Sequence, residues 1–224
     1  MNWVKFMKTD FLLYKYQKVV MMVFPVFVIL MSIYSKDMIF IISYLCFGVL
    51  IVSTTPYCLE NRNMSTFIQM LPGSDRERVV GRYMCFGAML LAAVAYGIGV
   101  VIVLSWIKGF PVTEYNIYFS SVALALSLIV GSVQFLVLYI AGRGKSTQWM
   151  NILRMIPGFI FFFLINYIGE KGKEGQVESS ILGLADFFVQ NKFICLISMA
   201  AAALLVFAGC ILVSVKVVQS RDAI

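Results

Sequence analysis

The sequence predicts an all-α integral membrane protein with six transmembrane helices, and three observations lead there. Of its 224 residues, 61% are hydrophobic and 13% charged, whereas soluble domains usually carry about 25% charge. The apolar residues gather in six long runs, and a helix needs roughly 20 apolar residues to cross the hydrocarbon core. Backbone polar groups must be satisfied within lipid, and the runs are too long for strands. We therefore expect one membrane domain over 1–224, with no appended soluble domain.

The first 18 residues, MNWVKFMKTDFLLYKYQK, have helical periodicity before the first apolar run. Apolar side chains recur along one side at intervals of three or four residues, at Trp3, Phe6, Met7, Phe11 and Tyr14. Another side carries Lys5, Lys8 and Lys15. This pattern is typical of an interfacial helix on the inner leaflet, and a generic basic anchor without a partner is the alternative. No short apolar core precedes a small-residue cleavage motif, so we expect the segment to be retained.

The expected spans cover approximately 19–34, 38–55, 83–106, 115–141, 149–168 and 192–215. Their orientation follows from Lys and Arg, which gather on the cytoplasmic side of membrane proteins. With the N-terminus inside, all but five of the 18 Lys and Arg residues are cytoplasmic, the exceptions being Lys36, Lys108, Lys171, Lys173 and Lys192. The sequence therefore predicts a multi-pass protein of the cell membrane with both termini in the cytoplasm. Its basic character indicates topology and anionic lipid, not nucleic acid.

The connection between the second and third spans, residues 58–82, is charged and carries a turn at Pro72-Gly73. Before the turn, a short helix is expected, with Met64, Phe67 and Leu71 on an apolar side and Glu60 and Arg62 facing water. After it, Ser74 and Glu77 have the spacing of a capping box, which predicts a new helix that runs into the third span. Arg76, Arg78 and Arg82 are then left to face lipid phosphates or a protein.

Capping and topology explain much of this connection, but a simple hairpin would need only a few residues. We therefore favour a docking surface for a soluble partner.

Two further connections between spans carry recognisable patterns. The inner connection AGRGKSTQW contains Gly-Lys-Ser, the last residues of a P-loop motif. It has Tyr139 where the motif needs its first glycine, and a membrane helix precedes it in place of a strand. We therefore interpret Arg143 and Lys145 as inner-face anchors. The outer segment 169–191 predicts an amphipathic helix, either re-entrant or lying on the surface.

The spans offer no catalytic or metal site. The chain has no histidine, and its five cysteines lie singly, without the paired spacing of a zinc or disulfide framework. Apart from Arg154, no ionisable group lies within a span, which disfavours an ion-coupled carrier. Larger polar side chains that are available to a translocation path or to hydrogen bonds between helices are Gln134, Asn151 and Asn166.

These features meet in one family. The stretch LPGSDRERVVGRYM resembles the signature of small type-2 (ABC-2) ABC transporter permeases, matching it at Leu71, Pro72, Ser74, Glu77, Val79 and Tyr83, with Arg76 and Arg82 in place of lysines. It departs from that signature at Gly73, Asp75 and Arg78. The resemblance in plan extends over the whole chain, from the N-terminal interfacial helix to the last span.

The resemblance implies a permease subunit without an ATPase site or bound cofactor, which pairs with an identical or related subunit. ATP and magnesium would be bound by separate cytoplasmic ATPase subunits. The connection 58–82 would be the coupling region, with Glu60, Arg62, Met64, Phe67 and Leu71 inserted in a groove of the ATPase. Ser74, Arg76, Glu77 and Arg78 would brace it, and Lys5, Lys8, Lys15, Arg143 and Lys145 would make secondary contacts. The expected cargo is an amphipathic peptide, such as a toxin, bacteriocin or antibiotic, or a similar amphiphile.

Other readings stay open from the residues alone. A non-transporting membrane protein, such as an immunity or assembly factor, would use the same connection to bind something else. An ion-coupled carrier lacks the buried acids that it normally needs. Co-purification of a soluble protein with a complete P-loop separates the permease from both.

Overall fold

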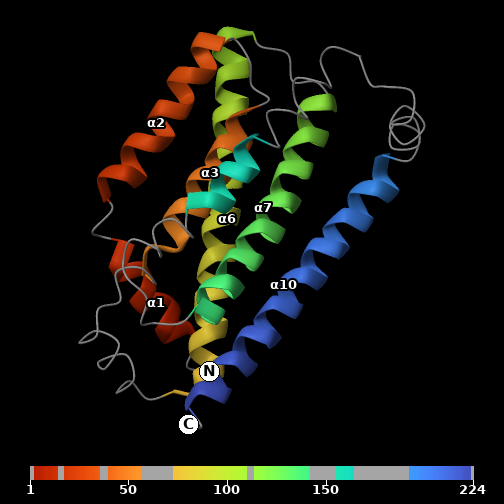
Figure 1. Ribbon diagram of the computed structural model, residues 1–224. Coiled ribbons are helices and arrows are strands. Elements are labelled where there is room, and N and C mark those ends of the chain that lie inside the picture. The colour runs from red at the N-terminus through yellow and green to blue at the C-terminus, as the bar shows by residue number, and fades with distance from the viewer. Residues whose placement is uncertain are drawn as a thin grey trace.

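The computed structural model of the chain describes residues 3–14, 18–35, 40–56, 73–109, 114–141, 155–163 and 192–222. Helices account for nearly all of these residues, and no strand occurs among them. Six helices are labelled in Figure 1, namely α1 (Trp3–Leu13), α2 (Lys18–Ser35), α3 (Phe40–Ser53), α6 (Asp75–Lys108), α7 (Glu114–Ala141) and α10 (Lys192–Asp222). A further helix covers residues 155–163.

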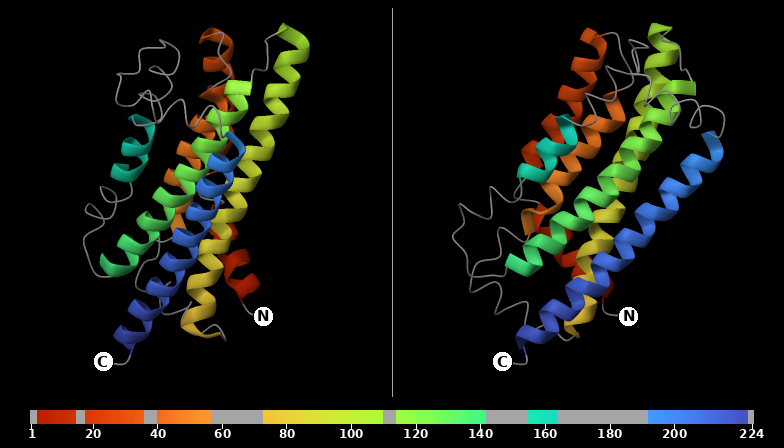
Figure 2. Two further views of the ribbon diagram at one scale, coloured as in Figure 1. Left: turned by 90° about the vertical axis from the view of Figure 1, so that its right-hand side faces the viewer. Right: turned by 45° about the vertical axis from the view of Figure 1, so that its right-hand side comes forward.

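The long helices form one bundle (Figures 1 and 2). Helix α6 runs away from the end at which both chain termini lie, and α7 returns towards that end. Helix α10 runs in the same direction as α7, and the two form the most extensive helix–helix interface. Two consecutive described long helices that run the same way need a crossing between them, and the predicted fifth span would supply it.

The core forms where α3, α6, α7 and α10 meet. Its largest fully buried side chains include Tyr83 and Phe86 of α6, Leu50 of α3 and Leu138 of α7. Phe161 of the 155–163 helix joins the same cluster. Cys46, Cys85, Cys195 and Cys210 are buried free thiols.

Within the described part of the chain, three helices are long and apolar enough to cross a membrane, in α6, α7 and α10. Shorter apolar helices cover Met21–Leu30 and Ile41–Ser53, within the first two predicted spans. Of the fifth predicted span, residues 155–163 are described, and they are helical. Helices at all six predicted positions are therefore confirmed in the described residues, while six membrane crossings and their orientation stay predictions.

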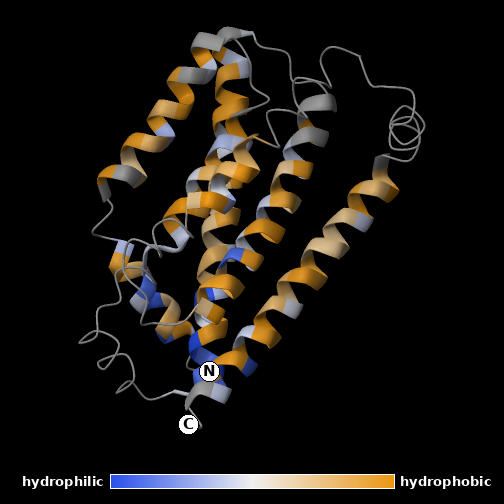
Figure 3. Cartoon of the chain, viewed as in Figure 1, coloured by the Kyte–Doolittle hydropathy of each residue, from blue (hydrophilic) through white to orange (hydrophobic). Residues whose placement is uncertain are grey.

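Hydrophilic residues gather at the end of the bundle that holds both termini (Figure 3). They lie on α1, on the first turns of α6 and on the last turns of α10. The rest of the bundle is largely hydrophobic on its surface, as a lipid-facing surface requires. At the other end, α6 stops at Gly109, whose left-handed φ of 66° lets its N–H donate to the Ser105 carbonyl at 3.0 Å.

Candidate functional site

The candidate site is the junction of α1, α3 and the first turns of α6, at the end of the bundle where the termini lie. Helix α6 begins with the predicted capping box. The Glu77 N–H donates to the Ser74 hydroxyl at 3.3 Å, and the Ser74 N–H donates to the Glu77 carboxylate at 3.2 Å. Asp75 and Glu77 place negative charge in the first turn, where the helix dipole favours it. The prediction of a helix that starts at Ser74 and runs on into a span is confirmed.

Helix α1 lies against these first turns at very short range. A Cβ added to Gly81 would lie 2.9 Å from the Trp3 carbonyl oxygen and 2.9 Å from the Phe6 Cβ. Only glycine lets the two backbones approach this closely, so Gly81 is the contact point of the pair. Phe6 is buried and also lies next to Gly73, just before the start of α6.

A buried ion pair crosses the same interface. The Nε of Arg82 on α6 lies 3.6 Å from the Oδ2 of Asp10 on α1, and both side chains are almost wholly buried. Two buried charges lose their hydration, and they are tolerated only when they compensate each other. Asp10 therefore fixes which side of α1 faces α6.

Arg78, one turn before Arg82, is enclosed as well. Its guanidinium lies over the Phe6 ring, 5.7 Å from the ring centre, within the range of a cation–π interaction. Its Nη1 is 3.5 Å from the Asp75 carboxylate. The expectation that Arg78 and Arg82 are exposed to lipid or a partner is therefore wrong, because α1 covers both of them. Arg76 is exposed, as expected.

The far end of the α1 segment is held to α3. The buried Tyr14 hydroxyl donates to the Ser53 carbonyl at 2.9 Å, at the last residue of α3. Burial raises the pKa of Tyr14 far above its ordinary value, so the hydroxyl stays a donor. The N-terminal segment thus contacts both helices that flank the connection 57–72: α3 through Tyr14, and α6 through Phe6 and Asp10.

The two faces of α1 differ in part from the pattern expected. Phe6 and Tyr14, expected on the side that faces the leaflet, are buried against the protein, and Lys5 and Lys8 are exposed. Phe11, expected on the same side as Phe6, is 45% exposed, and the buried side includes Asp10 and Leu13. Asp10 was missed by the sequence reasoning. Its signal was an acid four residues after Phe6 and four before Tyr14, within the stripe that turned out to be buried.

Deeper in the bundle, Tyr83 joins three helices. Its hydroxyl lies 2.9 Å from the Ser214 hydroxyl of α10 and 3.3 Å from the Ser132 carbonyl of α7. Its ring contacts Phe135 and Phe207, again one from each of these helices. Tyr83 sits directly after Arg82, so the start of α6 is connected to α1 on one side and to α7 and α10 on the other.

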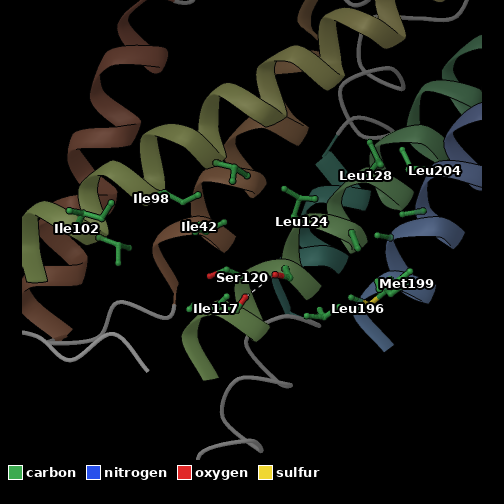
Figure 4. A pocket seen from close by; sticks show the side chains of 17 residues that line it. Ile42, Ile98, Ile102, Ile117, Ser120, Leu124, Leu128, Leu196, Met199 and Leu204 are labelled. Carbon is green, nitrogen blue, oxygen red and sulfur yellow. Dashed lines mark hydrogen bonds between the residues drawn. The ribbon is translucent and has the colours of Figure 1, made fainter. Parts of the chain in front are cut away.

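A cavity of about 750 Å³ lies between the halves of α6, α7 and α10 that are far from the chain termini (Figure 4). Its lining is apolar except for Ser120 and Ser121 of α7. Leu124 and Leu128 of α7 and Met199 of α10 are among the side chains that line it (Figure 4). Gln134 is buried in α7 and does not line this cavity, so its place on a translocation path stays a prediction.

The remaining predicted site residues lie outside the described residues. They are Lys15, Glu60, Arg62, Met64, Phe67, Leu71, Pro72, Arg143, Lys145, Asn151 and Asn166. The predicted amphipathic segment 169–191 and Cys58 fall there too.

A family model described as "ABC-2 family transporter protein" matches residues 5–219, nearly the whole chain. Comparison with curated proteins and with solved structures gives no significant match.

Proposed function

The chain belongs to the ABC-2 transporter family, and on that premise we propose that it is the permease subunit of an ATP-driven exporter. Separate cytoplasmic ATPase subunits supply the energy, and two permease subunits, identical or related, enclose the path. ATP binding closes the ATPases, and the connection between α3 and α6 converts that closure into tilting of the helices.

One observation carries this proposal beyond family membership: α6 is a single unbroken helix of 34 residues that includes both the charged junction and a membrane span. At a rise of 1.5 Å per residue it is about 50 Å long. A displacement applied at its capped first turn is therefore carried as a rigid body into the hydrocarbon core. Arg76, exposed in that first turn, is available to a partner surface. Residues 58–72, with Glu60 and Phe67, would provide the rest of the ATPase contact.

The cargo is proposed to be an amphipathic peptide or a similar amphiphile. The apolar cavity between α6, α7 and α10 supports this class, since its lining offers hydrocarbon contacts and only two hydroxyl groups. Ligand sites of this kind usually measure about 300–1,000 Å³. No carboxylate lines the cavity, which does not suit a carrier that binds protons or sodium there.

The proposed coupling contact is tested by reversing the charge of Arg76. The chain is purified with its ATPase, and Arg76→Glu is compared with Lys216→Glu, a reversal of an exposed lysine in the last two turns of α10. We expect Arg76→Glu to weaken ATPase retention by about tenfold or more, because a negative charge would then face a partner surface that is complementary to the positive charge of Arg76. The Lys216→Glu variant should retain the ATPase.

The outcomes separate two failures. Equal retention by both variants would remove Arg76 from the coupling contact and leave the permease assignment standing. If no protein with a complete P-loop accompanies even the unmodified chain, the assignment itself fails and a non-transporting role for the chain is favoured.

A further inference from the structure

A narrow apolar slot lies between α2 and the α3–α6 pair, separate from the large cavity of Figure 4. It measures about 240 Å³. Met21, Phe24 and Pro25 of α2 form one wall, and Gly48 of α3 and Ala92 of α6 lie opposite. Along α6 it reaches from Met89 to Tyr96, a length of about 10 Å at 1.5 Å per residue.

The slot reaches α1 at Phe11, which lines it. Phe11 is held in place by an edge-to-face contact with the buried Tyr14 ring, at 6.0 Å between ring centres. Phe11, at the start of the slot, is therefore held by Tyr14, the residue whose hydroxyl also bonds the N-terminal segment to α3.

Two lysines stand on the same exposed stripe of α1 as Phe11. This stripe consists of Val4, Lys5, Lys8, Phe11 and Leu12, with the spacing of one helix face. Lys8 lies one turn before Phe11, and among the described residues neither Lys5 nor Lys8 forms an ion pair. An apolar slot thus begins within one or two helix turns of two exposed positive charges.

Such a juxtaposition fits a molecule with an anionic head and a hydrocarbon tail. Phe11, Met21 and Tyr96, which line the slot, are themselves exposed at the surface of the bundle, so the slot is accessible from the lipid. One leaflet contributes about 15 Å of hydrocarbon, half of the usual core thickness, and the slot would take the first two-thirds of a chain of that depth. A zwitterionic lipid fits the slot equally well but leaves the lysines without a net countercharge.

We propose that this slot is a binding site for one anionic phospholipid of the leaflet on the α1 side. Its phosphate lies at Lys5 and Lys8, and one acyl chain enters past Phe11 and lies against Ala92. The bound lipid spans α1, α2 and α6, and so stabilises α1 in its position on α6. The site is independent of the cargo and of the proposed export.

The test is native mass spectrometry of the full chain released from membranes of equal parts phosphatidylglycerol and phosphatidylcholine. Four variants are compared with the unmodified chain. Lys5→Gln combined with Lys8→Gln removes the charges, Ala92→Phe fills the slot, and the other two are matched controls. The controls are Lys216→Gln and Ala201→Phe, both at exposed positions on α10 outside the slot.

We expect the unmodified chain and both controls to retain one phosphatidylglycerol in preference to phosphatidylcholine. The double lysine variant should lose that preference by about 25-fold, since each lysine near an anionic lipid contributes about 1 kcal/mol, or roughly fivefold. Ala92→Phe should reduce retained phosphatidylglycerol by a similar factor, because the acyl chain no longer fits.

Loss of the preference in the lysine variant without loss of lipid in Ala92→Phe would indicate attraction to a diffuse surface charge, and would overturn the proposed binding site. Loss of both lipids in Ala92→Phe with unchanged preference in the lysine variant would mean ordinary annular lipid. Displacement of the lipid by free glycerol phosphate would also overturn the proposed lipid site, because the phosphate alone would then be enough for binding.

Discussion

At the residue scale, Asp10 and Arg82 decide how α1 sits on the bundle. Taking both charges out of water costs several kcal/mol per ion, and their attraction across 3.6 Å offsets that cost only while both are present. The pair is thus a weak source of net stability but a strong determinant of orientation. A rotation of α1 about its axis would separate Asp10 from Arg82 and leave both charges uncompensated.

Removing one partner should therefore be more damaging than removing both. We expect Asp10→Leu to lower the free energy of unfolding by about 3 kcal/mol, because Arg82 is left buried without its countercharge. Asp10→Leu combined with Arg82→Met should recover most of that loss. The free energy of unfolding is measured for the unmodified chain, the single variant and the double variant, in mixed micelles with an increasing fraction of denaturing detergent. A double variant as unstable as the single one would show that the two residues do not act as a pair.

The sequence predicts some of these residues and not others, for a physical reason. The Ser74–Glu77 capping box is local, since both hydrogen bonds join residues three apart, and the pattern alone predicts it. The burial of Arg78 and Arg82 is not local. It depends on α1, more than 60 positions earlier in the chain, so the pattern of charges around them indicates only that they are near water.

At the scale of elements, α1 acts as a strap between α3 and α6. Tyr14 contacts the last residue of α3, and Asp10 and Phe6 contact the first turns of α6. The proposed coupling region lies between those two helix ends in the chain. Movement of α6 relative to α3 must therefore stretch or shift α1, which gives the N-terminal segment a mechanical role beyond anchoring. Tyr83 contacts α7 and α10, so a movement of the start of α6 would reach both of these helices as well.

The strap depends on the close approach at Gly81. We expect Gly81→Ala to accelerate amide hydrogen exchange in residues 3–14 by about tenfold or more, since the added Cβ would displace the backbone of α1. Gly99→Ala on the same helix is the matched control, because nothing lies within 4 Å of its Cβ position. Helix propensity alone favours alanine over glycine by about 0.5–1 kcal/mol, so faster exchange in the control as well would refute the strap.

At the scale of the whole molecule, hydropathy predicts where the helices are but not how they pack. The predicted spans 115–141 and 192–215 coincide closely with α7 and with most of α10. The position of the two cavities depends instead on which helices diverge, and that follows from side chains such as Phe24, Phe86 and Leu124 in contact across the bundle. Periodicity does not encode such pairings.

The predicted topology can be tested by labelling single cysteines. Each cysteine is introduced into a variant from which the five native cysteines have been removed. Lys36→Cys and Lys173→Cys should react with a membrane-impermeant maleimide added to intact cells. Arg76→Cys and Arg143→Cys should react only after permeabilisation, because they lie on the cytoplasmic side. Labelling of position 173 from the inside would remove the fifth crossing and place the end of α10 on the opposite face.

The most direct test of the central claim is the composition of the complex that the chain forms in its native membrane. Gentle extraction, affinity purification and native mass spectrometry give both the partners and the stoichiometry. The account predicts an assembly of two permease subunits, identical or related, with two copies of a soluble subunit that has a complete P-loop. A chain recovered alone, or with partners that lack a P-loop, would contradict it.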